Sequence, residues 1–472
     1  MARICDPQVS FADAEMKAQG IGLDKTLKAI SDLLDRNRGL VDRVLQDLQR
    51  GLKRPTTGRN AMSAAQVLRS FILRRIKDWD LRELRERIAD GYSLRLFTAF
   101  GSQHVPSFRA FGRAFNRLTP ETVRALNEAV VKAAVAMGLE DGSKLRLDTT
   151  VVETDVHYPT DSTLLWDVVR VLSRLSKQLR ERLPQLRSVF HDRTRRARRR
   201  AHEISRMTSK ERTRQQRKRY RDLLQVCEEV MDKAQAVAAE AKPLIPGLEL
   251  MDAAVVEYLI SQVQHFSGLG QRVVAQTTRR VIRNEQVPVE EKLFSIFETH
   301  TDMILRGKAR TPVEFGHKVL LVESSKGLIT HYEVLNGNPS DQDHVTPTLE
   351  RHRQAFGAPP QLFASDRGFH SEDNLLACQQ AGVKIESIPQ RGGQKTPERA
   401  AHEKSRIFKQ AQRFRAGIEG RISVLFRGRG MKRCLSEGRP RFETFVGAAV
   451  LASNLLVLAA LLEKKRPRKR AA

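Results

Sequence analysis

A strand that carries an acidic residue sets the strongest limit on how this chain folds. Residues 144–154 read Lys-Leu-Arg-Leu-Asp-Thr-Thr-Val-Val-Glu-Thr, so Leu145 and Leu147 alternate with polar residues before a β-branched pair. The pattern predicts a strand with Asp148 on the face opposite the two leucines. Aspartate is depleted in strands. Either that face is exposed to solvent, or the strand holds the carboxylate rigidly as a metal ligand.

A second acid follows a later strand. Residues 362–364 are apolar, and Asp366 comes just before a turn marked by Gly368. If this strand pairs with residues 144–154, Asp148 and Asp366 lie side by side. Two neighbouring carboxylates favour a two-metal site for phosphoryl transfer. Such a site usually has a third carboxylate.

A long helix, expected from about 401 to about 426 by its periodicity, offers candidates for the third acid. They are Glu403 and Glu419. Glu419 borders the buried stripe of the helix, and Arg415 precedes it by one turn. An ordinary surface ion pair at i,i+4 also explains Arg415 and Glu419 when they are taken alone. The predicted stripe consists of Ile407, Ala411, Phe414, Ile418, Ile422 and Leu425.

The charge balance indicates a polyanionic partner. Lys and Arg number 83 against 55 Asp and Glu, which gives a net charge of +28 over 472 residues. Nucleic acid is the usual partner of so basic a chain, and a membrane surface is the weaker alternative. The four cysteines lie far apart and the N-terminus has no signal peptide. We therefore expect a cytoplasmic protein without a disulfide framework or zinc ribbon.

One uncharged stretch is long enough to mislead. Residues 445–462 carry no charge over 18 residues, which just reaches the length of a membrane span. The stretch is rich in alanine and interrupted by Gly447, Ser453 and Asn454. We therefore expect a helix buried in the core and no membrane span.

The N-terminal region is predicted to be helical. Ser63 and Asp80 are candidate caps of two successive amphipathic helices, an arrangement that fits either a helix-turn-helix or an ordinary helical bundle. A further basic helix carries three arginines that are candidates for DNA contact. They are Arg109, Arg113 and Arg117.

A basic helical segment separates the first strand from the later ones. Residues 187–221 hold 15 Lys and Arg but three Asp and Glu. Such a run either forms a solvated surface or contacts phosphates, where it displaces condensed cations. The densest candidates are Arg198, Arg199, Arg200, Arg217, Lys218 and Arg219.

The remaining elements predict an α/β sheet that begins with an antiparallel meander. After the helical segment, strands and helices alternate up to the long helix. The expected strands are 317–323, 328–335, 362–365 and 383–388, and the expected helices between them are 345–354 and 372–381.

Four blocks of this sequence together resemble bacterial insertion-sequence transposases with an Asp-Asp-Glu triad, most closely the ISNCY family. They are Leu147-Asp-Thr-Thr-Val-Val-Glu-Thr154 with Tyr158-Pro-Thr-Asp-Ser162, Arg306-Gly-Lys308 with Glu314-Phe-Gly-His-Lys318, Ala364-Ser-Asp-Arg-Gly-Phe369, and Arg415-Ala-Gly-Ile-Glu419. The third-acid block departs from the related wider signature. Gln412 stands where that signature has a tyrosine, and Phe426 stands where it has a lysine. The next residue, Arg427, would take over the role of that lysine.

The resemblance implies an RNase H-like mixed sheet with a large all-helical insertion and an N-terminal helical domain. It implies that Asp148, Asp366 and Glu419 hold two Mg²⁺ or Mn²⁺ ions, with Arg415 and Arg427 as accessory residues. The resemblance implies that these ions activate water, which would nick double-stranded DNA at the transposon end. The freed 3′-OH would then attack target DNA. A homo-oligomer on DNA is expected. The regions would be 1–140 (helix-turn-helix-like, DNA-binding), 141–162 with 312–463 (catalytic core), 163–311 (basic insertion) and 464–472 (basic tail).

Two other readings of the sequence stay open. One is a DNA-binding protein without catalysis, such as a decayed transposase, although the presence of all three acids disfavours it. The other is a metal-dependent nuclease without strand transfer, which the triad alone does not distinguish from a transposase.

Overall fold

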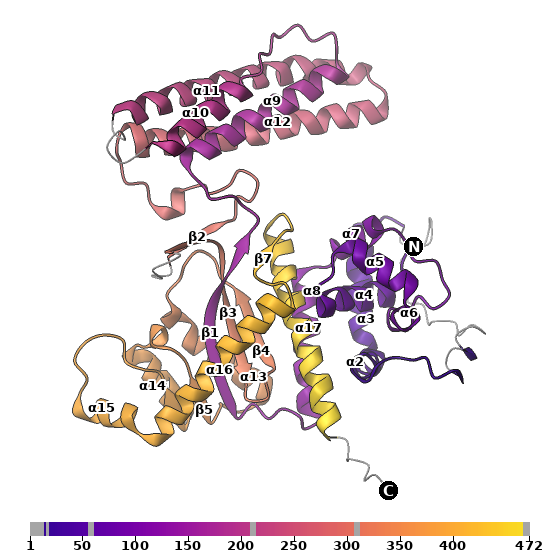
Figure 1. The fold of residues 1–472 in the computed structure, drawn as a ribbon, viewed down its shortest axis with the longest axis vertical. Coiled ribbons are helices and arrows are strands. Elements are labelled where there is room, and N and C mark those ends of the chain that lie inside the picture. The colour runs from indigo at the N-terminus through magenta and orange to yellow at the C-terminus, as the bar shows by residue number, and fades with distance from the viewer. Residues whose placement is uncertain (1–13, 16–17, 55–60, 208–213, 306–311, 466–472) are drawn as a thin grey trace. The chain divides into compact units, whose positions relative to one another are not determined.

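The chain forms two compact units (Figure 1). The core unit comprises Met1–Glu153 and Gly316–Ala472, and the helical unit comprises Thr154–Phe315. The computed structural model describes residues 14–15, 18–54, 61–207, 214–305 and 312–465. The Arg306-Gly-Lys308 stretch and residues 466–472 of the predicted basic tail lie outside the described residues.

A mixed sheet forms the centre of the core unit. β1 (Lys144–Thr154) pairs antiparallel with β3 (Val313–Ser324), which pairs antiparallel with β4 (Ile329–Val334). On its other side β1 runs parallel to β5 (Leu362–Ala364), and β5 runs parallel to β6 (Ile385–Ser387). The strands that carry or precede Asp148 and Asp366 are therefore direct neighbours. The sequence did not predict two short strands, β2 (Asp302–Leu305) beside β3 and β7 (Arg433–Cys434) beside β1.

Helices cover both faces of this sheet. Leu145 and Leu147 pack in an apolar cluster with α13 (Val345–Phe356) and α14 (Glu372–Ala381). Val152, on the other face, packs with α16 (Arg406–Gly428) and α17 (Arg439–Lys465). Asp148 faces α16, as the alternation in β1 predicts, because its side chain bonds to a residue of that helix.

The prediction of one continuous helix from about 401 to about 426 is wrong at its start. The chain forms a short helix, α15 (Pro397–Lys404), before α16 begins. Ser405 breaks the two apart with an extended backbone, and its hydroxyl caps α16 by accepting a hydrogen bond from the Phe408 amide. Pro397 stands in the first turn of α15, where proline needs no amide hydrogen.

The N-terminal helices share one core with α17. Ser63 and Gln66 form a capping box at the start of α4 (Ala64–Lys77), and Asp78, in the left-handed conformation, ends this helix. Of the apolar 18-residue stretch of α17, 67% is buried, so this helix, long and apolar enough to span a membrane, is a core helix as expected. The helices that share this core are α2 (Lys25–Arg36), α3 (Arg38–Gln49), α4 (Ala64–Lys77), α5 (Leu81–Asp90), α6 (Tyr92–Phe97), α7 (Phe108–Phe115) and α8 (Pro120–Ala136), of which α2, α4 and α8 contact α17 directly.

The helical unit is a bundle of long helices around its own apolar core (Figure 1). Of the four long helices described in this unit, the first, α9 (Asp161–Arg182), packs against each of the other three, and its apolar side chains are largely buried. The unit, Thr154–Phe315, begins nine residues before the predicted insertion of 163–311 and ends four residues after it. Its long helices are α9 (Asp161–Arg182), α10 (Thr194–Arg206), α11 (Arg214–Ala241) and α12 (Leu250–Thr277).

Candidate active site

Three predicted acids surround one arginine in the core unit. Arg415 on α16 places Nη2 at 2.8 Å from Asp148 Oδ2 and at 3.7 Å from Asp366 Oδ2. Its Nη1 donates to Glu419 Oε1 at 3.1 Å, one turn further along the helix. The pair of Arg415 and Glu419 is thus not only a surface pair, because the same guanidinium binds the two strand-borne acids.

The two aspartates are close enough to face a common ion. Because one Arg415 nitrogen lies near both, the carboxylate oxygens of Asp148 and Asp366 are no further apart than the sum of those two distances. That sum is below the ~8 Å that we take as the limit for carboxylates sharing paired metals ~4 Å apart.

The carboxylate oxygens of these acids suit Mg²⁺ or Mn²⁺ chemically, although the three acids are not spaced as ligands of one ion. Carboxylate oxygens are the ligands that these cations prefer. Among the described residues, no group of three His, Cys, Asp or Glu side chains is spaced to hold a metal ion. Arg415 is bound between the acids, and its positive charge keeps three carboxylates together.

Local backbone geometry fixes the two aspartates more firmly than the glutamate. Asp148 sits in the ladder opposite Leu321, and its Oδ1 accepts the Thr149 amide at 2.8 Å. Asp366 follows β5 and accepts the Gly368 amide at 2.8 Å, which caps the short helix η5 (Arg367–Phe369). The Glu419 side chain is 68% exposed, against 13% for Asp148. Glu419 can therefore change its side-chain conformation, whereas Asp148 is held in place by the strand.

The site strongly perturbs one of its acids. Burial raises the pKa of Asp148 to about 6. The Arg415 guanidinium opposes this rise, while the negative charges of Asp366 and Asp341 add to it. A buried carboxyl with a raised pKa and a specific charged partner is typical of functional sites.

A buried ion network holds α16 on the sheet. Glu323 on β3 has no exposed side-chain surface and binds Arg146 Nε and Arg421 Nε, each at 2.8 Å. Arg146 also donates to the Phe414 carbonyl at 2.5 Å and lies 4.8 Å from the centre of the Phe414 ring. Because Phe414 precedes Arg415, this network fixes the helical turn that meets the acids.

The two positions that depart from the transposase signature have different surroundings. Gln412 donates from Nε2 to the carbonyls of Ser365 at 3.2 Å and Ser387 at 2.8 Å, and so joins the ends of β5 and β6 to α16. Arg427 is exposed and donates to Ser423 on its own helix. Gln412 thus supports the strand end that precedes Asp366, while Arg427 points to solvent.

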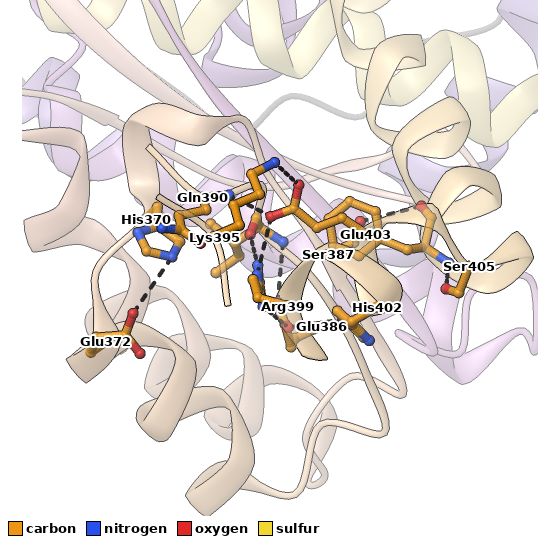
Figure 2. Close-up of polar contacts among 12 residues, drawn as sticks. His370, Glu372, Glu386, Ser387, Gln390, Lys395, Arg399, His402, Glu403 and Ser405 are labelled. Carbon is orange, nitrogen blue, oxygen red and sulfur yellow. Dashed lines mark hydrogen bonds and ion pairs between the residues drawn. The ribbon is translucent and has the colours of Figure 1, made fainter. Parts of the chain in front are cut away.

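Glu403, the alternative third acid, belongs to a structural network (Figure 2). One oxygen accepts the Gln390 amide at 2.9 Å and Arg399 Nε at 3.1 Å, and the other binds Lys395. Arg399 also binds Glu386 on β6 at 2.9 Å. Both oxygens of Glu403 therefore hold the loop after β6 against α15, and this geometry favours Glu419 as the third acid.

A fourth acid, Asp341, lies beside the site and is not predicted by the sequence patterns. Asp341 begins the short helix η4 (Asp341–His344). Its Oδ1 accepts the Thr149 hydroxyl at 3.0 Å and lies 2.8 Å from Lys318 Nζ. Nothing in the spacing of Asp341 marks it, because it follows a polar loop and its partners lie on other strands.

The basic residues proposed for DNA contact differ in their surroundings. On α10, Arg198 and Arg199 are exposed. The Arg200 side chain is 17% exposed and already binds Asp222 and Glu203. Arg219 pairs with Glu203 at 3.1 Å, whereas Lys218 is exposed and Arg217 half-buried. In the core unit Arg109 and Arg113 are exposed on α7, and Arg117 donates to the Arg50 carbonyl.

Comparison with protein families identifies two matching segments. Residues 304–455 match the family model of the transposase DDE domain, and residues 20–117 match that of a transposase domain (DUF772). No curated protein and no solved structure matches the chain. The first segment includes Asp366, Arg415 and Glu419, and the second covers the helices from α2 to α7.

Proposed function

We propose that the chain is an insertion-sequence transposase that cuts DNA at transposon ends and joins the freed 3′-OH to target DNA, as its matches to two transposase family models support. The convergence of Asp148, Asp366 and Glu419 on Arg415 is the observation that carries this proposal. We infer an RNase H-like core, because two of the acids lie on or after adjoining parallel strands and the third lies on a covering helix. Among insertion-sequence families, the sequence blocks favour ISNCY.

The acids would hold two divalent ions, Mg²⁺ or Mn²⁺, as DDE transposase domains generally use divalent metals. When bound, such ions activate the attacking oxygen and stabilise the leaving one. Asp148 supplies a rigid carboxylate, Asp366 a second from the neighbouring strand, and Glu419 an adaptable third. Arg415 would turn from the carboxylates to a DNA phosphate, which a guanidinium binds equally well. Its buried Nε has no hydrogen-bond partner among the described residues, so that donor would gain one if the side chain turned to a phosphate.

A strand-transfer assay with a labelled oligonucleotide that carries the transposon end and Mn²⁺ tests the proposal. The wild-type protein is expected to give both a nicked end and a joined product, and Asp148→Asn neither. A nick without joining indicates a nuclease. DNA binding without either product indicates a decayed transposase.

DNA contact is proposed for both units. Exposed cations of the helical unit would contact phosphates and so position the duplex without reading its sequence. We assign the choice of transposon end to the N-terminal helices, where Arg109 and Arg113 are exposed and Arg117 completes the predicted set. A homo-oligomer on DNA would bring two transposon ends together.

The salt dependence of DNA binding tests the role of α10. Replacing Arg198 and Arg199 with alanine should weaken binding to specific and random duplexes by similar factors. The slope of log affinity against log salt should become shallower by up to ~1.8 units, at ~0.9 for each lost phosphate contact. Arg200→Ala is the matched control. The Arg200 guanidinium is already paired with Asp222 and Glu203, so the salt slope of this variant should stay near that of wild type. An unchanged slope in the double variant would identify the run as a solvated surface.

The rate of cleavage should fall as pH drops through about 6. The raised pKa of Asp148 means that its carboxyl carries a proton below about pH 6 and cannot then bind a cation. At limiting Mg²⁺, single-turnover cleavage should rise about tenfold per pH unit below that pKa and level off above it. With the ordinary pKa of 3.8 the rate would already be level at pH 5. DNA affinity measured at each pH separates binding from chemistry, and a level rate down to pH 5 contradicts the prediction.

A further inference from the structure

Asp341 links three parts of the core unit that the chain itself keeps apart. Its Oδ1 accepts the Thr149 hydroxyl of β1 at 3.0 Å and lies 2.8 Å from Lys318 Nζ on β3. Lys318 Nζ also donates to the Pro339 carbonyl at 2.8 Å, which fixes the loop that leads to Asp341. The charged pair is largely buried, with Lys318 and Asp341 side chains 11% and 23% exposed. Such a pair needs good geometry to offset the loss of hydration.

The same segment is joined to the turn that carries Asp366. Asn374 donates to the carbonyls of Gln342 and Phe369, each at 2.9 Å. Gln342 in turn donates to the His370 carbonyl. The helix η4 therefore lies directly against η5, so a shift of Asp341 moves the backbone beside the second acid.

Gly368 shows how closely the two carboxylates approach this turn. A Cβ added there would lie 2.9 Å from Asp366 Oδ1 and 3.0 Å from Asp341 Oδ2. Any larger residue would push at least one of these oxygens from its present position. Two like charges flank one residue here, and Lys318 neutralises one of them by binding the far oxygen of Asp341.

We propose that Asp341, backed by Lys318, is a positioning residue that fixes the turn of Asp366 so that its second oxygen faces the space shared with Asp148. This inference rests on the proposed function, because positioning Asp366 matters only if Asp366 binds a cation. Oδ1 of Asp341 binds Thr149 and Lys318, and Oδ2 lies beside Gly368 in the turn that follows Asp366. Residues that orient a metal ligand in this way typically change metal affinity or activity by about 10- to 100-fold when they are replaced.

Direct Mn²⁺ binding to the full-length protein without DNA, followed by electron paramagnetic resonance, tests the inference apart from activity. Asp341→Asn should weaken Mn²⁺ binding by about 10- to 100-fold. Asp343→Asn is the matched control, since it removes the same charge from an exposed position of the same short helix and should bind Mn²⁺ like wild type. Thr149→Val removes one hydrogen bond to Asp341 at similar volume, and should weaken binding by about fivefold, the equivalent of roughly 1 kcal/mol. Thermal unfolding of each metal-free variant shows whether it is folded.

The outcomes separate this inference from the proposed function. If Asp341→Asn binds Mn²⁺ like wild type while Asp148→Asn does not, the positioning role is wrong and the metal site stands. If neither substitution changes Mn²⁺ binding, both proposals are overturned. Should Asp341→Asn fail to fold, Thr149→Val decides: unchanged Mn²⁺ affinity in this folded variant overturns the positioning role.

Discussion

Replacing Glu419 with glutamine is expected to reduce cleavage at the transposon end by about a thousandfold or more, because a lost anionic ligand removes several kcal/mol of transition-state stabilisation and each ~1.4 kcal/mol is tenfold in rate. DNA affinity should stay nearly unchanged. The Glu419 side chain is 68% exposed and contacts Arg415, so the substitution costs the fold little. Single-turnover cleavage and a binding titration with the same labelled end measure the two effects.

Glu403→Gln supplies the matched comparison on the neighbouring helix. It weakens the contacts of Glu403 with Lys395 and Arg399 in the network of Figure 2, so the melting temperature should fall while the rate constant of cleavage is kept. The reverse pattern, a fully active Glu419→Gln and an inactive but folded Glu403→Gln, would assign the third acid to Glu403.

Local patterns in the sequence predicted the elements that carry the acids. Alternation in β1 placed Asp148 opposite Leu145 and Leu147, because successive side chains of a strand point to opposite faces. The structure confirms this, since the leucines pack with α13 and α14 while Asp148 faces α16. The apolar run and glycine turn around Asp366 likewise predicted β5 and the turn after it.

Contacts between distant parts of the chain were beyond these patterns. Asp341 and Thr149 are 192 positions apart, and neither residue carries a periodic signal for the other. The break between α15 and α16 depends on one capping serine inside an otherwise helical sequence, and tertiary contacts of Arg399 with Glu386 hold α15 in place. The position of Asp341 beside the site and the helix break at Ser405 both depend on tertiary packing, which the periodicity of the sequence does not encode.

The buried network beneath α16 gives the second large prediction. Glu323→Ala should lower the free energy of unfolding by about 3–5 kcal/mol, because it leaves two desolvated guanidinium groups, of Arg146 and Arg421, without their carboxylate. Those side chains are 13% and 19% exposed, and Glu323 is fully buried. Denaturant unfolding monitored by circular dichroism measures the change. Glu83→Ala, which breaks an exposed pair with Arg87 at 3.5 Å, is the control and should cost at most ~1 kcal/mol.

The position of Glu323 connects this stability to the acids. Arg146 and Glu323 are cross-strand partners on β1 and β3, and Arg146 reaches the Phe414 carbonyl next to Arg415. A hydrophobic replacement of the whole network would keep the packing but remove this fixed contact between strand and helix. The triple variant Arg146→Met, Glu323→Leu, Arg421→Met should therefore regain much of the stability lost in Glu323→Ala yet cleave DNA poorly, since α16 can then shift relative to Asp148. Wild-type cleavage by a stable triple variant would show that the network serves stability alone.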